Sequence, residues 1–269
     1  MESVSCEIGY RKVYMNMIRL VLVALYLVLF LLLTLPVIFA EWILNIFRPD
    51  LTAKSSRAIV AWGFRCILFL SGVKLTVLGK ENIPDDRAVV YVGNHRSMFD
   101  TVLTYPCFPN PTGIVAKKET LKVPILRLWM MHIGCIFLDR QNIKEGLKSI
   151  LAGIEQIKSG RSICIFPEGT RSRVPDEFLP FHEGSFKLAS KSGAPVIPMT
   201  IVNSAAIFED HFPWIKKSKV ILEFGQPILI SELPKETQRA VGSYVSGIIQ
   251  KRYFELKKEY FPGDSAVNS

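Results

Sequence analysis

A histidine and an aspartate five residues apart are the pair of side chains best suited to chemistry in this sequence. His95 and Asp100 lie in the segment Tyr91-Val-Gly-Asn-His-Arg-Ser-Met-Phe-Asp100, after an apolar run that is typical of a buried strand. Gly93 and Asn94 permit a sharp turn there, so His95 would be presented at the end of that strand. A carboxylate that accepts a hydrogen bond from one imidazole nitrogen fixes the tautomer and makes the other nitrogen more basic. The pair therefore predicts a general base for an alcohol.

This spacing is common by chance, and it is not specific by itself. His95 can equally be a helix-capping or core histidine, with Asp100 a surface carboxylate. The catalytic interpretation depends on which other residues share the same place in the fold.

Arg140 follows a second apolar run, residues 134–138, and would lie at the same edge as His95 if both runs are parallel strands. Arginine suits bidentate recognition of a phosphate group. The alternative is a surface salt bridge between Asp139 and Arg140.

A third polar segment, Phe166-Pro-Glu-Gly-Thr-Arg171-Ser-Arg173, also comes directly after an apolar run. Backbone N–H groups around Gly169, together with Thr170 and Arg171, would form an anion site. Glu168 would orient a substrate hydroxyl or pair with an arginine. The alternative is an ordinary polar loop. A fourth segment, residues 194–199, places two prolines around an apolar pair, as an edge strand or as part of an acyl-chain site.

The elements that must position these residues alternate along the chain. We expect strands at 74–78, 88–93, 113–116, 135–138, 162–166, 196–202 and 220–224, and helices at 98–106, 120–132, 143–159, 183–192 and 235–258. Alternation of this kind predicts an α/β fold, a single layered domain whose largely parallel sheet is flanked by helices. Functional residues of such folds lie beyond the carboxyl ends of the strands.

The N-terminal part of the chain has a different texture. Residues 20–40 carry no charged side chain, and as a helix they would extend about 31 Å, close to the thickness of the hydrocarbon core of a bilayer. Residues 58–73 are also apolar but contain Arg65, which predicts an interfacial helix with Arg65 reaching the headgroups. Pro36 can kink the first segment, so a full span and a helical hairpin in one leaflet both fit. The expected organisation is a membrane anchor at 1–73, a catalytic domain at 74–262 and a tail at 263–269.

Composition narrows the classes of partner. The net charge of +9 favours anionic partners, but the basic residues are scattered and no nucleic-acid-binding motif is visible, so we expect lipid and not nucleic acid. The five cysteines are odd in number and contain no C-x-x-C, which predicts free thiols instead of disulfides or a zinc site. No G-x-S-x-G, H-E-x-x-H or Walker A motif occurs, which argues against a serine lipase, a zinc protease and a P-loop enzyme.

Together, the four polar segments resemble the glycerolipid acyltransferase family, which includes lysophosphatidic acid acyltransferases. They match in order across residues 90–200: Asn94 to Asp100, residues 134–140, Phe166 to Ser172, and Val196-Ile-Pro198. The resemblance implies membrane attachment and transfer of an acyl group from acyl-CoA or acyl carrier protein as the donor substrate, with no metal or other cofactor. It implies His95 as the base and Asp100 as its orienting group. It places Arg140, Glu168, Gly169 and Arg171 at the glycerophosphate, where Thr170 of the expected anion site would also bind, with Lys118 as a further phosphate contact.

One segment departs from the family pattern. Many relatives carry Lys-Lys-Gly after the third segment, Phe166 to Ser172. This chain has Phe181-His-Glu-Gly-Ser-Phe-Lys187 there. The expected reaction is acylation of the sn-2 hydroxyl of lysophosphatidic acid by a membrane enzyme whose catalytic domain faces the cytoplasm. Acylation of glycerol 3-phosphate or of another lysophospholipid, and non-catalytic binding of anionic lipid, are the alternatives.

Overall fold

Seven strands form one twisted sheet in the computed structural model, which describes residues 2–139 and 142–263, with the side chains of 2–12 and 143 left out. The order across the sheet is β1-β7-β6-β2-β5-β3-β4, and every neighbouring pair is parallel except β6 and β7. The largely parallel sheet predicted from the sequence is confirmed. The strands are β1 (Lys74–Leu78), β2 (Val90–Gly93), β3 (Thr112–Lys117), β4 (Ile136–Leu138), β5 (Ser162–Ile165), β6 (Val196–Val202) and β7 (Lys219–Phe224).

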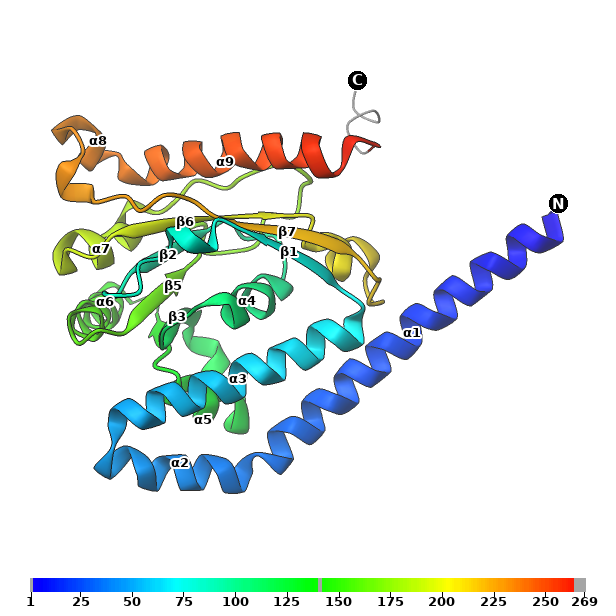
Figure 1. The fold of residues 1–269 in the computed structure, drawn as a ribbon, viewed down its shortest axis with the longest axis horizontal. Helices are drawn as coiled ribbons and strands as arrows, with labels where there is room; N and C mark the ends of the chain where they lie inside the picture. Colours follow the sequence, from blue (N-terminus) through cyan, green and yellow to red (C-terminus); the bar gives the residue numbers. More distant parts are fainter. Residues whose placement is uncertain (1, 140–141, 264–269) are drawn as a thin grey trace.

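The central strands are buried on both faces, which explains why they are continuous apolar runs. In β2, Tyr91 packs into one hydrophobic layer, while Val90 and Val92 pack into the other. The first layer is covered by α3 (Pro49–Ser71), α4 (Phe99–Thr104) and α5 (Pro124–His132), and the second by α6 (Ile143–Lys158), α7 (Lys187–Ser192) and α9 (Val241–Tyr260). Figure 1 shows α9 along one side of the sheet and α3 and α5 along the other.

Several helix boundaries differ from the predicted ones. The helix expected at 120–132 begins only at Pro124, after a 3-10 turn at Lys118–Lys122. The helix expected at 235–258 is two helices, α8 (Lys235–Arg239) and α9, which meet at Ala240. Glu183, in the segment that departs from the family pattern, accepts hydrogen bonds from the Gly242 amide at 3.0 Å, near the start of α9. That segment therefore caps a helix.

The N-terminal region consists of three helices where the sequence predicted two. α1 (Glu2–Leu33) ends near Thr34, α2 (Leu35–Phe47) follows directly, and α3 begins at Pro49. Proline lacks an amide hydrogen and is tolerated only in the first turn of a helix, so Pro36 and Pro49 mark helix starts. The segment expected as one helix over 20–40 is therefore divided between α1 and α2, and the helix expected at 58–73 starts nine residues earlier.

The N-terminal helices leave a large apolar surface exposed. The stretch Val13–Leu33 of α1 is 21 residues long, is apolar enough to cross a membrane, and has no buried residue. On α2, Phe39, Trp42 and Phe47 are also exposed. α1 projects past the edge of the sheet (Figure 1). Exposed apolar surface of this extent indicates membrane association. Arg65, predicted to reach the headgroups, is exposed, and its guanidinium donates a hydrogen bond to the carbonyl of Pro106 at 3.2 Å.

Candidate active site

The carboxyl ends of β2 and β5 lie side by side in the middle of the sheet. These strands pair in parallel, with Val92 opposite Ile165, so the residues that follow them emerge at one edge. The segment from Asn94 to Asp100 therefore meets the segment from Phe166 to Arg173. This is the crevice where α/β proteins usually place functional groups.

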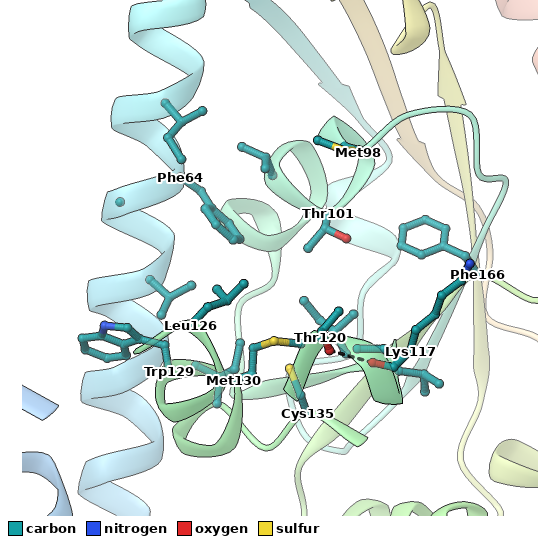
Figure 2. A pocket seen from close by; sticks show the side chains of 18 of the residues that line it. Phe64, Met98, Thr101, Lys117, Thr120, Leu126, Trp129, Met130, Cys135 and Phe166 are labelled. Atoms are coloured by element: carbon teal, nitrogen blue, oxygen red, sulfur yellow. Dashed lines mark hydrogen bonds between the residues drawn. The ribbon is translucent and has the colours of Figure 1, made fainter. Parts of the chain in front are cut away.

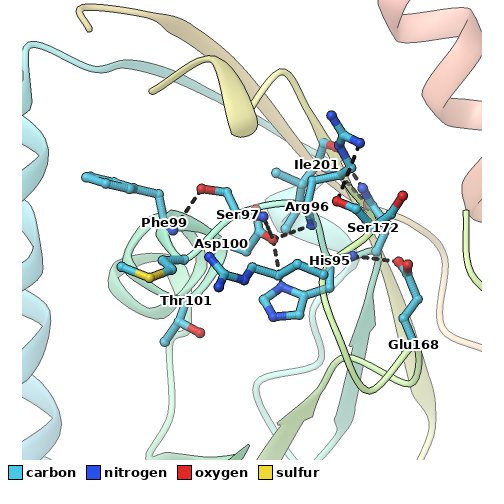
Figure 3. Close-up of polar contacts among 12 residues, drawn as sticks. His95, Arg96, Ser97, Phe99, Asp100, Thr101, Glu168, Ser172 and Ile201 are labelled. Carbon is cyan, nitrogen blue, oxygen red and sulfur yellow. Dashed lines mark hydrogen bonds and ion pairs between the residues drawn. The ribbon is translucent and has the colours of Figure 1, made fainter. Parts of the chain in front are cut away.

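His95 and Asp100 form the predicted pair. The Nδ1 atom of His95 lies 2.8 Å from Oδ2 of Asp100 (Figure 3). The carboxylate is fully buried, whereas 22% of the histidine side chain is exposed. This geometry leaves Nε2 of His95 as the nitrogen available to a substrate, which is the arrangement that a general base needs.

Asp100 is also bound to the turn that carries the histidine. Its Oδ2 accepts the backbone amides of Arg96 and Ser97, each at 2.8 Å. Asp100 lies in the first turn of α4, where a negative charge is favoured by the helix dipole. A single carboxylate oxygen thus fixes both the imidazole and the local backbone.

Glu168 supports the same histidine from the neighbouring loop. Its Oε1 accepts the backbone amide of His95 at 2.7 Å, and its Oε2 accepts the amide of Leu179 at 3.1 Å. The side chain is buried and does not line the pocket beside His95. Burial raises the pKa of Glu168, and the two amide donors oppose that shift. Its place in the structure is therefore behind the histidine and away from the space in which the sequence predicted a substrate contact.

Two further residues fix the position of the histidine ring. Phe166 stacks on His95 with ring centroids 4.6 Å apart. The side-chain amide of Asn94 donates a hydrogen bond to the carbonyl of Ile201 and accepts one from the backbone N–H of Ile201, both at 2.9 Å. These two bonds join the turn to β6. Because both partners are buried, loss of these hydrogen bonds would leave unsatisfied backbone groups.

Arg171 is held by Glu209, a residue that is not predicted from the sequence. One carboxylate oxygen of Glu209 accepts hydrogen bonds from Nη1 of Arg171 and from the backbone N–H of Met98, each at 2.8 Å. The other accepts the hydroxyl of Ser97 at 2.5 Å. Glu209 lies in a 3-10 turn within the irregular link between β6 and β7, and no motif marks it.

A pocket of about 610 Å³ opens beside His95 and has two chemically distinct ends. Its polar end, which we call the mouth because Lys117, Thr170 and Arg173 are exposed there, is lined by His95, Gly169, Thr170, Arg171, Arg173 and Lys117. Its interior is apolar and runs between α1, α3 and α5, with Phe30, Phe64 and Trp129 among the lining residues. Figure 2 shows Phe64, Trp129 and Met130 around the interior, with Phe166 and Lys117 on the opposite side. A cationic mouth and an apolar interior suit an amphipathic ligand.

Comparison with known proteins decides the family. The acyltransferase family model matches residues 74–202. The 1-acyl-sn-glycerol-3-phosphate acyltransferase of Haemophilus influenzae is 32% identical over 78% of this chain and 87% of its own length. That of Borreliella burgdorferi is 31% identical over 71% of this chain and 76% of its own. This chain belongs to the 1-acyl-sn-glycerol-3-phosphate acyltransferase family.

The fold agrees with that membership. The crystal structure of the 1-acyl-sn-glycerophosphate acyltransferase PlsC from Thermotoga maritima superposes with a TM-score of 0.78, covering 92% of this acyltransferase and 99% of that chain, at 22% sequence identity. The superposition extends over most of the chain, so the arrangement of sheet and helices is shared.

Some of the predicted site residues of this acyltransferase line the pocket, and others do not. His95, Gly169, Thr170 and Arg171 line the pocket. Arg140 lies outside the described residues.

Lys118 does not line the pocket; its Nζ lies 3.0 Å from Oδ2 of Asp139, and more than half of its side chain is exposed. Its neighbour Lys117 lines the pocket instead. Lys117 is the last residue of β3 and Lys118 begins the following 3-10 turn, so the sequence favours Lys117 only if the end of the strand is known.

Cys66, Cys107, Cys135 and Cys164 are free thiols, as predicted. Within the described part of the chain, no three His, Cys, Asp or Glu side chains are grouped so that they could hold a metal ion.

Proposed function

We propose that this acyltransferase moves a fatty acyl group from a thioester donor to the sn-2 hydroxyl of lysophosphatidic acid and so produces phosphatidic acid. The donor is acyl-CoA or acyl carrier protein. The observation that carries the proposal is the juxtaposition of the His95–Asp100 pair with a pocket that has a cationic mouth and an apolar interior. The names of the relatives support the choice of acceptor.

In the proposed mechanism, Nε2 of His95 removes the proton of the acceptor hydroxyl while its oxygen attacks the thioester carbonyl. Asp100 holds the imidazole through Nδ1 and stabilises the imidazolium that forms. The tetrahedral intermediate then collapses, the C–S bond breaks, and the thiolate leaves and takes the proton back from His95. The acceptor oxygen attacks directly, so no covalent acyl-enzyme is needed.

The acceptor phosphate binds at the mouth of the pocket in this proposal. Arg171, Thr170 and the backbone of Gly169 surround the space next to His95, and Arg173 and Lys117 add positive charge. Gly169 has φ +73°, a left-handed conformation that glycine adopts without strain. The apolar interior holds the acyl chain that is transferred. Soluble thioester donors are consistent with a catalytic domain on the cytoplasmic face of the membrane.

The test is an acceptor panel with labelled acyl-CoA and acyl-carrier-protein donors, with each product identified. The panel contains lysophosphatidic acid, glycerol 3-phosphate and other lysophospholipids. Phosphatidic acid as the dominant product supports the proposal, and a dominant product from another acceptor replaces it.

Non-catalytic lipid binding is tested separately with Asp100→Asn. Loss of transfer with retained lipid binding supports an enzyme that uses this pair. Absence of transfer by the wild-type protein with every donor and acceptor would show that the site only binds lipid.

A further inference from the structure

An aromatic and basic loop connects β6 to β7 on the side of the molecule where α1 passes the sheet. We call residues 212–217, Phe-Pro-Trp-Ile-Lys-Lys, the 212–217 loop. Phe212 is 74% exposed, although it is a large aromatic side chain. Ile215 is buried in the core and thereby fixes the loop, while Lys216 and Lys217 are exposed. The loop therefore presents an aromatic ring and two lysines to solvent from a fixed position.

The loop lies next to the apolar N-terminal helix. Gly72, which ends α3, is the meeting point, because a Cβ atom there would be 3.4 Å from Nε of Arg19 on α1 and 3.4 Å from Cβ of Lys217. The link from β6 to β7 is seen at the end of the sheet nearest to α1 and to the end of α3 (Figure 1). The loop is therefore continuous with the surface that associates with lipid.

The surroundings of the loop are basic. Lys74 and Lys219 are opposite each other in the β1–β7 register, and both are exposed. None of the four lysines Lys74, Lys216, Lys217 and Lys219 takes part in an ion pair with another described residue. Lysines near a membrane surface are attracted to anionic headgroups, and aromatic side chains favour the interfacial region.

We propose that the 212–217 loop is a second membrane contact of this enzyme, in which Phe212 enters the interfacial region and Lys216 and Lys217 bind anionic lipid headgroups. The apolar helix α1 attaches the chain to the membrane, and the 212–217 loop determines the orientation of the catalytic domain relative to the bilayer. The occupant is a lipid surface because the loop adjoins α1 and carries lysines that lack carboxylate partners.

The loop is also close to the active site along the chain. Glu209, which holds Arg171 and the start of α4, is three residues before Phe212. Three residues span at most about 11 Å. Contact of Phe212 with the bilayer would therefore bring the mouth of the pocket close to the headgroup level, where the phosphate of a lysophospholipid lies. This consequence rests on the proposed function, but the contact itself does not.

The contact is tested without any measurement of activity. The full-length protein is placed in vesicles that contain phosphatidylglycerol brominated close to the headgroup, which quenches nearby tryptophan fluorescence. Phe212→Trp is compared with Phe254→Trp, a control at an exposed phenylalanine of α9 on the opposite side of the sheet. We expect strong quenching of the fluorescence added at 212 and little quenching of that added at 254. Equal quenching at both positions would overturn the proposal.

A second experiment tests the charge. Lys216→Glu/Lys217→Glu is compared with Lys251→Glu/Lys258→Glu, two exposed lysines of α9. In anionic vesicles we expect the loop variant to lose at least about fivefold in kcat/KM for lysophosphatidic acid, whereas in neutral detergent micelles it matches the control. A loss confined to the acyl-carrier-protein donor and equal in vesicles and micelles would instead mark a protein-docking surface and would overturn the lipid contact. If the wild-type enzyme does not acylate lysophosphatidic acid, the proposed function fails, and the quenching result still decides the membrane contact.

Discussion

The buried carboxylate of Asp100 joins the proposed base to the backbone that carries it. One oxygen accepts the His95 ring and the amides of Arg96 and Ser97. An uncharged amide in this position would not stabilise the positive charge of a His95 imidazolium. Its N–H group would also favour the wrong tautomer of the His95 ring. Orientation of the histidine and stabilisation of its charge are therefore functions of the same atom.

Substitution of Asp100 should affect the chemical step more than binding. We expect Asp100→Asn to lower kcat about 10²- to 10⁴-fold with KM for the acceptor nearly unchanged. Steady-state kinetics with labelled donor measure this. Asp86→Asn is the control, because that carboxylate is exposed and pairs with its neighbour Arg87. A rise in KM at constant kcat would indicate that Asp100 serves binding.

Glu209 should act as a positioning residue. We expect Glu209→Ala to lower kcat/KM about tenfold, since Arg171, Ser97 and the Met98 amide lose a shared charged acceptor. Glu209→Gln keeps the shape and one acceptor, so most activity should return. Rescue by glutamine separates positioning from a direct role of the charge, and equal losses in both variants would argue against positioning.

The raised pKa of Glu168 leads to a prediction for stability. The folded protein binds the Glu168 proton more tightly than the unfolded chain, because burial disfavours the ionised form. The contribution of Glu168 to the free energy of unfolding is therefore greatest below its ordinary pKa and falls as pH rises through the raised pKa.

Thermal unfolding in detergent can detect this dependence. We expect the Tm of the wild type relative to Glu168→Gln to decrease between about pH 4 and pH 7. Glu236→Gln, at an exposed position of α8, should show no such trend relative to the wild type. A pH-independent difference for Glu168→Gln would contradict the prediction.

At the scale of elements, the sequence predicts strands better than helix ends. The strands are apolar runs that are buried on both faces, so their signal is strong and all seven are present. The division of the N-terminal segment at Thr34 is not evident in the sequence, because Pro36 permits either a kink within one helix or the start of a new helix. The sequence therefore does not show that α1 and α2 are separate helices.

The candidate site shows the same limit. His95, Asp100 and Arg171 follow strands, and their types and spacing predict their place in the site. Lys117 and Lys118 are adjacent, but Lys117 ends β3 and lines the pocket, whereas Lys118 begins a 3-10 turn and does not. Glu209 is 109 residues from Asp100 in sequence and lies in irregular structure, so only the folded chain reveals its contacts.

The pocket between α1, α3, α5 and β3 should determine the length of the transferred chain. Ala116 lines it and lies on the same side of β3 as Ile114, which is buried in the layer that contains Trp129. We expect Ala116→Phe to reduce kcat/KM for long-chain donors at least about tenfold and to spare short-chain donors, because the added ring fills the space. A donor series from short to long chains measures this. The retained short-chain activity is the internal control for folding, and a uniform loss across the series would contradict it.

At the scale of the whole molecule, α1 has two faces with different tasks. Leu20, Val23, Phe30 and Leu31 pack against the core, and some of them line the pocket. Val21, Leu25 and Val28 are exposed and, at spacings of four and three residues, share the opposite face. One helix thus completes the pocket wall and presents an apolar surface to lipid, so removal of the whole helix would not separate the two tasks.

Charged substitutions on one face of α1 at a time should separate membrane attachment from formation of the pocket wall. We expect Leu25→Lys/Val28→Lys to weaken membrane attachment, measured as the fraction released by carbonate extraction, while activity on detergent-dispersed substrates stays within about twofold, because neither changed position is buried. Phe30→Lys should instead abolish most activity in detergent as well, since Phe30 lines the pocket. If the exposed-face variant loses activity in detergent to the same extent as Phe30→Lys, the two faces are not independent, and attachment and catalysis must be coupled through the helix itself.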